Sequence, residues 1–249
     1  MFAVLFEIHP KSDQFNVYLD YAKMLAPELK RLDGFIDVIR YRSLTREGWL
    51  LSLSRWRDED AIARWRKAPM HRDAQAKGRS EVFIDYRIRV GQLTRDSQLL
   101  GANTLDHRLE LAETGSASAV TLVDSKQPAE LVLHSSPQDI AKWLGIDLNS
   151  DGLVTWDVFE AVLTPGDIIL LISWHDEVAA GSFEGRFSFQ NSRRLRRVSV
   201  VRDYGRFDRR EAPPQPADVE CAAEVGQSGV AAGKADHAVV CDPGIKSRR

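Results

Sequence analysis

The fold is decided by residues 33–59, DGFIDVIRYRSLTREGWLLSLSRWRDE, because the same pattern recurs later in the chain. Residues 151–177, DGLVTWDVFEAVLTPGDIILLISWHDE, align with it without a gap at a constant offset of 118 residues. Each copy opens on Asp-Gly, carries a second glycine between two apolar runs, and ends on Trp-x-Asp-Glu. Apolar runs on both sides of a glycine-containing turn predict a β-hairpin. The repetition predicts a chain built from two copies of one unit.

The segments around the first hairpin predict the rest of that unit. Residues 2–8 read as a strand, and a segment capped by Ser12 or Asp13 has apolar residues at helical spacing. Asp58 is placed to cap a second helix, Pro69 to start a short third one, and residues 81–92 alternate like a half-buried strand. The order β-α-β-β-α-β is the ferredoxin-like arrangement.

The second copy restarts the pattern after a connection. Residues 93–117 lose the periodicity, and residues 118–205 again predict strand, Ser-capped helix, hairpin and last strand. We therefore expect domains at 1–92 and 118–210, with a linker at 93–117. Residues 211–249 contain no aromatic side chain, so we expect a disordered tail.

The composition narrows the class of protein. The 249 residues include 34 basic and 36 acidic residues, a net charge of −2, which disfavours nucleic acid as a partner. The two cysteines, Cys221 and Cys241, exclude a disulfide framework and favour a reducing compartment. The amino terminus lacks the features of a signal peptide, and no apolar run is long enough to span a membrane. We expect a soluble, cytoplasmic protein without a membrane partner.

The stretch DLNSDG, residues 147–152, resembles the beginning of a calcium-binding loop. Such a loop needs a bidentate glutamate at its twelfth position, where this chain has Val158. The first copy retains only Asp33-Gly34 of the pattern. We therefore interpret the shared Asp-Gly as the end of a helix and the entry into a strand, a position that suits glycine.

The run LSLSRWRDEDAIARWRKAPMHRDAQAKGR, residues 51–79, followed by EVFIDYRIRV, resembles the antibiotic biosynthesis monooxygenase (ABM) domain of the dimeric α+β barrel superfamily. The motifs W-x-D-E, A-x-W and H-x-x-A-Q-x-x-G carry the resemblance, which is good over 1–92 and weak over 118–205. Family members pair two domains so that their sheets face each other. The resemblance thus implies an α+β fold with two ferredoxin-like domains that form an intramolecular pseudo-dimeric α+β barrel, with a homodimer of such chains also open.

The resemblance also implies a pocket between the sheet and the helices of the first domain. In cofactor-independent members, a Trp on the second helix, a polar partner and an Arg near the last strand act on polyketide phenols. Trp65, His71 and Arg87 match these roles, with Phe6 and Asp85 as candidate substrate-binding residues. The asparagine that family members carry about one turn before the Trp is missing here.

These residue types suit oxygenation without a metal or cofactor. The substrate, a small aromatic molecule, must supply the electrons to O₂, so a His with a pKa near neutrality removes a phenol proton and an Arg stabilises the anion. Each residue also has a structural interpretation: Trp65 in the core, His71 at the surface, and Arg87 solvated or paired with Asp85.

Two other functions stay open. The chain is either an oxygenase or a non-catalytic barrel that binds or scaffolds. The haem-degrading branch of the family fits less well, because Phe6 and Glu7 stand where it has a strand Asn and Gln75 where it has its His. No spacing typical of a metal site occurs. The basic run 193–210 contains interleaved acidic residues and is expected to form salt bridges between the domains.

Overall fold

A computed structural model describes residues 1–99, 117–128, 136–189 and 193–213, and residues Met1–Ala212 form one compact unit. Its strands and helices follow the chain in the order β1 (Phe2–Pro10), α1 (Phe15–Arg31), β2 (Phe35–Ser43), β3 (Leu50–Trp56), α2 (Glu59–Lys67), α3 (Pro69–Lys77), β4 (Phe83–Asp96), β5 (Ala119–Lys126), α5 (Pro137–Trp143), β6 (Leu153–Ala161), β7 (Asp167–Trp174), α6 (Glu177–Gly185) and β8 (Arg194–Gly205). A short 3₁₀ turn (Ser12–Gln14) precedes α1, and a π turn (Gly78–Val82) precedes β4.

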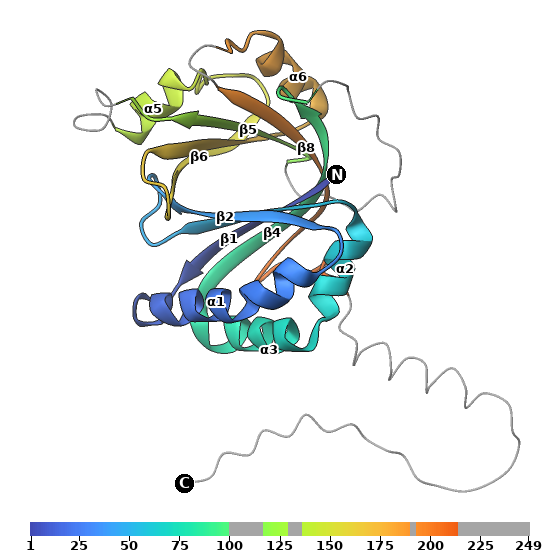
Figure 1. The fold of residues 1–249 in the computed structure, drawn as a ribbon. Helices are drawn as coiled ribbons and strands as arrows, with labels where there is room; N and C mark the ends of the chain where they lie inside the picture. Colours follow the sequence, from blue (N-terminus) through green and yellow to red (C-terminus); the bar gives the residue numbers. More distant parts are fainter. Residues whose placement is uncertain (100–116, 129–135, 190–192, 214–249) are drawn as a thin grey trace, which may run out of the picture. The chain divides into compact units, whose positions relative to one another are not determined.

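The eight strands form one closed barrel in the order β1-β3-β2-β6-β7-β5-β8-β4, and each of these pairings is antiparallel. The strands of the first half of the chain lie in the order β4-β1-β3-β2, and those of the second half in the corresponding order β8-β5-β7-β6. Helices α1, α2 and α3 cover the first four strands, and α5 and α6 cover the other four (Figure 1). The predicted α+β class with a barrel is confirmed.

The two halves join along two unequal seams. Strands β4 and β8 pair from Arg87 to Asp96, whereas β2 and β6 pair only from Tyr41 to Ser43. Strand β4 continues to Asp96, past the domain end expected at residue 92, because the partner strand β8 extends alongside it. Most of the expected linker and tail, residues 100–116 and 214–249, lies outside the described residues.

The Asp-Gly pairs at residues 33–34 and 151–152 have similar local structures. Gly34 has a φ of 91° and Gly152 a φ of 75°, a region that side chains disfavour. A Cβ atom at Gly34 would lie 2.6 Å from the Cβ of Ala61, and one at Gly152 would lie 2.5 Å from the Cβ of Ala179. Ala179 follows Ala61 by the same 118 residues, so each half packs a helix against its glycine.

The interpretation of residues 147–152 as the entry to a hairpin is also confirmed. The Asp147 side chain accepts the backbone N–H of Asn149 at 3.0 Å within a turn, and the chain continues into β6. Within the described ranges, no group of three or more His, Cys, Asp or Glu side chains is placed to hold a metal ion.

Helix boundaries followed local chemistry in most places. The Asp58 side chain accepts the backbone N–H of Ala61 and caps α2, and Pro69 begins α3, both as predicted. The cap predicted at Ser12 or Asp13 is wrong, since these residues lie in the 3₁₀ turn and α1 begins after Gln14 without a side-chain cap.

In the part of the chain that the structure describes, no helix is long and apolar enough to cross a bilayer.

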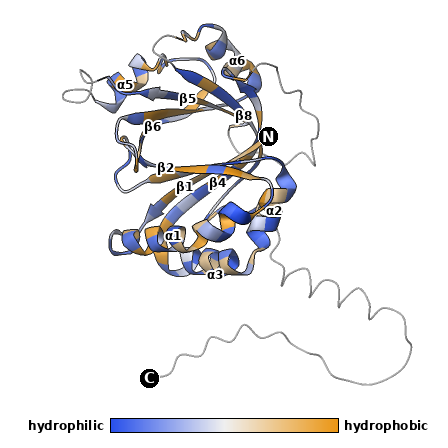
Figure 2. Cartoon of the chain, viewed as in Figure 1, coloured by the Kyte–Doolittle hydropathy of each residue, from blue (hydrophilic) through white to orange (hydrophobic). Residues whose placement is uncertain are grey.

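The sheet has two chemically different faces, because side chains alternate along each strand. One cluster draws on both halves of the chain and fills the barrel interior: Ala3, Leu5, Leu51, Leu53, Val120, Leu122, Ile169, Leu171 and their neighbours. The opposite face of each half lies under its helices, which carry both hydrophilic and hydrophobic residues (Figure 2). The site described next lies on the helix-covered face of the first half.

Candidate active site

Four neighbouring side chains cross the helix-covered face of the first half in a single row. Arg40 of β2 pairs with Ser52 of β3, Ser52 with Phe6 of β1, and Phe6 with Ile88 of β4. We call Arg40, Ser52, Phe6 and Ile88 the open row. All four are partly exposed although each lies within a barrel strand. Solvent therefore reaches this face of the sheet.

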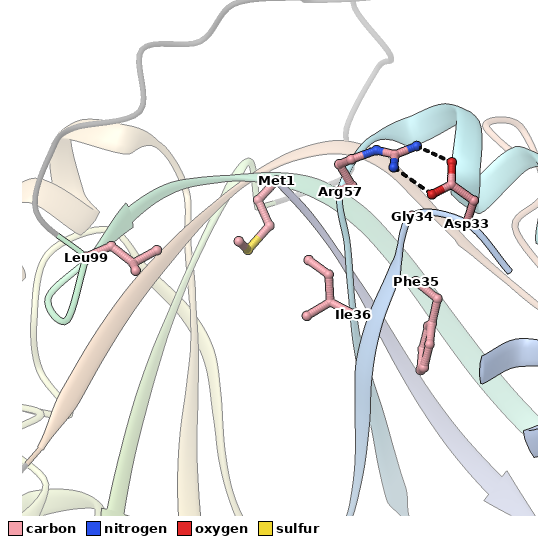
Figure 3. A pocket seen from close by; sticks show the side chains of 7 residues that line it. All are labelled: Met1, Asp33, Gly34, Phe35, Ile36, Arg57 and Leu99. Carbon is pink, nitrogen blue, oxygen red and sulfur yellow. Dashed lines mark hydrogen bonds and ion pairs between the residues drawn. The ribbon is translucent and has the colours of Figure 1, made fainter. Parts of the chain in front are cut away.

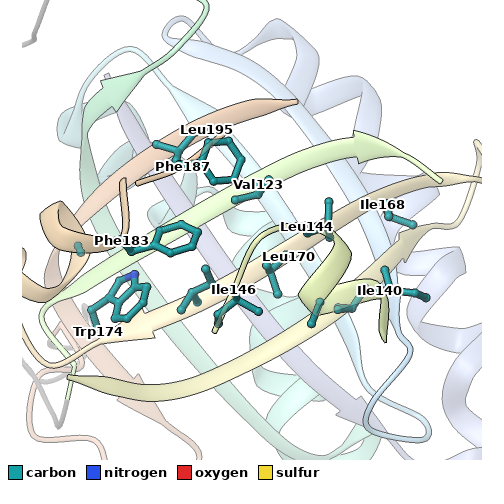
Figure 4. Packing of buried hydrophobic residues seen from close by; sticks show 14 of the residues in the cluster. Val123, Ile140, Leu144, Ile146, Ile168, Leu170, Trp174, Phe183, Phe187 and Leu195 are labelled. Carbon is teal, nitrogen blue, oxygen red and sulfur yellow. The ribbon is translucent and has the colours of Figure 1, made fainter. Parts of the chain in front are cut away.

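The same row in the second half is closed. Val158 of β6 pairs with Leu170 of β7, Leu170 with Val123 of β5, and Val123 with Leu195 of β8. We call these four residues the filled row. Each is 0% exposed within a cluster that includes side chains of α5 and α6 (Figure 4). Arg40 and Ser52 stand 118 residues before Val158 and Leu170, so repeat-related positions hold polar groups in one half and buried hydrocarbon in the other.

Tyr18 brings a hydroxyl from α1 to the polar end of the open row. The buried Tyr18 interacts with both Arg40 and Ser52. Burial raises the pKa of Tyr18, and the charge and hydrogen bond of Arg40 offset this only in part. The tyrosine therefore stays protonated and can donate a hydrogen bond. The polar end of the row combines a guanidinium group with two hydroxyls.

Trp65 of α2 and His71 of α3 form a stacked pair. Their ring centroids lie 4.3 Å apart with an interplanar angle of 15°. Trp65 is 8% exposed and belongs to a cluster with Leu25, Leu29 and Trp56, against which Val4 of β1 also packs. Trp65 thus has the core role of the structural interpretation, on the same face of the sheet as the open row but in a different cluster from Phe6 and Ile88.

His71 is held by two polar contacts. Its Nδ1 lies 2.9 Å from the carbonyl oxygen of Trp65 and 3.0 Å from Nε2 of Gln75. Burial lowers the pKa of His71 to about 4, and the contact with the Trp65 carbonyl counteracts this only partly. The expectation of a pKa near neutrality is therefore wrong. A neutral imidazole of such low basicity is suited to positioning Trp65 more than to removing a proton from a phenol.

The depressed pKa of His71 predicts that acid destabilises the fold through this residue. In the unfolded chain His71 has its ordinary pKa of 6.5, so as the pH falls from 6.5 towards 4 the unfolded state binds a proton that the folded state does not. Stability is therefore lost on acidification, by about 2–3 kcal/mol after allowing for partial exposure. Urea unfolding of the wild type and His71→Gln at about pH 7 and about pH 4.5 measures this difference.

The exposed His175 provides the control. His175→Gln should keep the pH dependence of the wild type, whereas His71→Gln should flatten it. Equal pH dependence in the wild type and His71→Gln would show that His71 is not held neutral.

The structure does not bring Arg87 to Trp65 and His71. Arg87 pairs in register with Glu7 and lies two residues before Arg89, so its side chain is on the same face of β4 as that of Arg89. This is the face toward the barrel interior. Its Nη2 forms an ion pair with Asp203 of β8 at 2.6 Å, so the expected partner Asp85 is not the one found. Asp85 instead accepts the backbone N–H of Tyr86.

Of the five predicted site residues, three share the helix-covered face: Phe6, Trp65 and His71. Sequence reasoning missed Tyr18, Arg40 and Ser52. A signal for two of them was available, because aligning the copies at the offset of 118 sets Arg40 against Val158 and Ser52 against Leu170. A polar residue in the middle of a strand, at a position where the other half has an apolar one, marks a face that is only partly packed.

A buried ionic network occupies the barrel side of the sheet. The Arg89 guanidinium lies 2.5 Å from one oxygen of Glu7 and donates to the Ser173 hydroxyl at 2.7 Å. Arg46 bridges the other Glu7 oxygen, at 2.6 Å, and Asp157, at 2.7 Å. Burial opposes ionisation of Glu7, but the charges of Arg89 and Arg46 outweigh it, so the pKa of Glu7 lies below its usual value. The network neutralises itself and ties the two halves together.

Charged residues also join the halves beside the seam between β4 and β8. Arg194 pairs with Asp96 at 2.5 Å and Arg202 with Glu59 at 3.4 Å. These contacts confirm the interpretation of the basic run 193–210 as a source of salt bridges between the halves.

A surface hollow of about 660 Å³ lies at the end of the barrel near the amino terminus (Figure 3). Met1, Phe35, Ile36 and Leu99 contribute its apolar lining. The guanidinium of Arg57 is paired with both oxygens of Asp33 at 2.7 Å. None of the predicted site residues lines the hollow, and it is separate from the open row.

Comparison with known proteins gives four findings. The family model described as antibiotic biosynthesis monooxygenase matches residues 1–77. The jasmonate monooxygenase ABM of Pyricularia oryzae is 44% identical over 219 residues, which are 86% of this chain and 97% of that protein. The uncharacterized protein YqjZ of Bacillus subtilis is 31% identical over 105 residues, 42% of this chain and 89% of that protein. A crystal structure of aldoxime dehydratase is similar with a TM-score of 0.49 and 11% identity, covering 80% of this chain and 81% of that one.

Proposed function

Since the chain belongs to the antibiotic biosynthesis monooxygenase family, we propose that it is a monooxygenase whose substrate binds along the open row, under the helices of the first half. The observation that carries this proposal is the contrast between the two rows. The second half buries Leu170 and Val158 completely, whereas the first half leaves Ser52 and Arg40 partly exposed at the equivalent positions. A partly exposed, partly polar face beside aromatic side chains offers a small ligand both apolar contact and polar partners.

The substrate proposed is a small, largely apolar molecule with a ring. Phe6 and Trp65 offer aromatic surface for such a ring, and Tyr18 and Ser52 offer hydroxyl groups for one polar substituent. Two classes are proposed for testing: the small phenols expected from the sequence, and jasmonate, on which the relative from Pyricularia oryzae acts by its name.

The oxygen chemistry is proposed to need no metal or flavin when the substrate is an electron-rich ring. A CH₂ group of such a ring becomes C=O, one atom of O₂ enters the product, and the other leaves as water with the two hydrogens. The substrate supplies all four electrons that reduce O₂, and the protein holds the ring next to O₂ while excluding bulk water. Hydroxylation of a saturated carbon would need two further electrons from an added reductant. In this scheme His71 holds Trp65 in place.

Oxygen uptake by the purified protein tests the proposal. The protein is given jasmonate or a polyketide-type phenol under air, with and without NADH as reductant, and the product is analysed by mass spectrometry with ¹⁸O₂. We expect uptake with at least one substrate class and one labelled oxygen atom in the product. Binding without uptake would favour the scaffold alternative. Uptake only after haem is added, together with a shift of the haem Soret band, would favour the haem alternative.

The two halves are further proposed to be ferredoxin-like copies that form an intramolecular pseudo-dimer. The matching strand orders and the equivalent packing at Gly34 and Gly152 support this proposal. The cytoplasmic location and the possible homodimer stay predictions.

A further inference from the structure

The polar end of the open row has a charge that its own surroundings do not neutralise. Arg40 lies on the helix-covered face opposite Ser52, with the Tyr18 hydroxyl beside it. Its Nε atom is buried and has no hydrogen-bond partner. Across the described ranges, no carboxylate forms an ion pair with Arg40. A buried N–H donor without an acceptor costs free energy, so this guanidinium is favoured by a further group that accepts its hydrogen bond.

The neighbouring arginine on the same face shows the contrast. Arg42 stands two residues further along β2, its side chain is 62% exposed, and it forms an ion pair with Glu160 of β6. The guanidinium of Arg42 is therefore both hydrated and paired with a carboxylate, whereas the neighbours of Arg40 are two hydroxyl groups. The second half has Val158 in the place of Arg40, with no charge.

We infer that Arg40, together with Tyr18 and Ser52, binds an anionic oxygen of the substrate, either a carboxylate or a phenolate. Arg40 supplies the charge and a planar set of N–H donors, and the two hydroxyls supply further donors. The apolar remainder of the ligand then extends over Phe6 and Ile88 along the same row. This inference rests on the proposed function, because it names the chemical class of the molecule that occupies the proposed site.

The inference is tested by binding, without turnover, using two pairs of probes. Jasmonate and its methyl ester differ only in the carboxylate, and naphthol and its methyl ether differ only in the phenol. Titration calorimetry under argon gives the ratio of dissociation constants within each pair. We expect the wild type to bind at least one anionic member about 10- to 100-fold more tightly than its methylated form, as expected for a charge-assisted contact. The pair that shows the preference identifies the source of the oxygen.

Variants then assign the preference to Arg40. Arg40→Val, which places the residue of the second half at this position, should abolish the preference while leaving affinity for the methylated probe within about threefold. Arg40→Lys should retain part of it, and the control Arg42→Gln should retain all of it. Circular dichroism and thermal unfolding confirm that each variant is folded.

The inference is overturned if Arg40→Val keeps the wild-type preference, or if neither anionic probe binds the wild type more tightly than its methylated partner. Oxygen uptake with the methylated probes would then leave the proposed monooxygenase function standing. Loss of uptake with every probe, despite a preference that depends on Arg40, would instead contradict the proposed function alone.

Discussion

Glu7→Gln should lower the free energy of unfolding by about 3–5 kcal/mol, because it leaves the charge of Arg89 buried without its counterion. Glu7 is 5% exposed and Arg89 is 1% exposed, so water cannot replace the lost carboxylate. Arg46 keeps Asp157 as a partner, which leaves Arg89 as the uncompensated group. Urea unfolding at neutral pH, followed by tryptophan fluorescence, measures the loss.

An exposed ion pair gives the matched control for this substitution. Glu160→Gln removes the carboxylate that Arg42 contacts, and the Arg42 side chain is 62% exposed, so the expected loss is below about 1 kcal/mol. The double variant Glu7→Gln with Arg89→Met should recover part of the loss, since no unpaired charge remains. A loss below about 1 kcal/mol for Glu7→Gln would mean that the barrel interior is hydrated and that the network does not hold the halves together.

Ser52→Leu should lower kcat/KM by about 100-fold or more, because it places in the open row the side chain that fills the second half. Leu170, the equivalent residue, is 0% exposed, and its neighbours Val123 and Leu195 complete a closed surface. A leucine at position 52 would occupy the space beside Phe6 and remove the hydroxyl near Tyr18. Oxygen uptake with the substrate that the wild type accepts measures the loss.

The control is the same substitution at an exposed site away from the row. Ser12→Leu, in the 3₁₀ turn before α1, should leave kcat/KM within about twofold. Thermal unfolding separates loss of the site from loss of the fold, since extra volume in a partly open face costs up to about 1–3 kcal/mol. If Ser52→Leu retains wild-type kcat/KM, the substrate binds elsewhere and the contrast between the rows has no functional meaning.

The parts of the fold that sequence predicted were those with local causes. The hairpins at 33–59 and 151–177 follow from glycines at turns and apolar runs between them, and the caps at Asp58 and Ser136 follow from side chains that accept backbone N–H groups. The prediction of a side-chain cap for α1 failed because Ser12 and Asp13, two residues of types suited to capping, lie in a separate 3₁₀ turn. The extension of β4 to Asp96 was not predicted, because it depends on pairing with β8, a strand about a hundred residues later in the sequence.

The candidate site was predicted only in part, for a geometric reason. Trp65 and His71 were placed together by the family resemblance, as a pocket tryptophan and its polar partner, and the structure stacks them. Arg87 was assigned to the same site by the family resemblance, as the arginine near the last strand, but successive residues of a strand face opposite sides of a sheet. The residue types at 85–89 do not show which side faces the barrel interior.

Sequence alone therefore predicts the order of strands and helices in each half of the chain, because hydrophobic period, turn glycines and caps act over a few residues and are visible in the sequence. Only the tertiary structure decides which face of the first sheet is open. That outcome depends on how the volumes of side chains from four strands and the covering helices add up: Arg40, Ser52, Phe6 and Ile88 leave solvent access, whereas Val158, Leu170, Val123 and Leu195 leave none. Packing is a property of residues that meet in space, so the same repeated pattern yields one closed core and one candidate site.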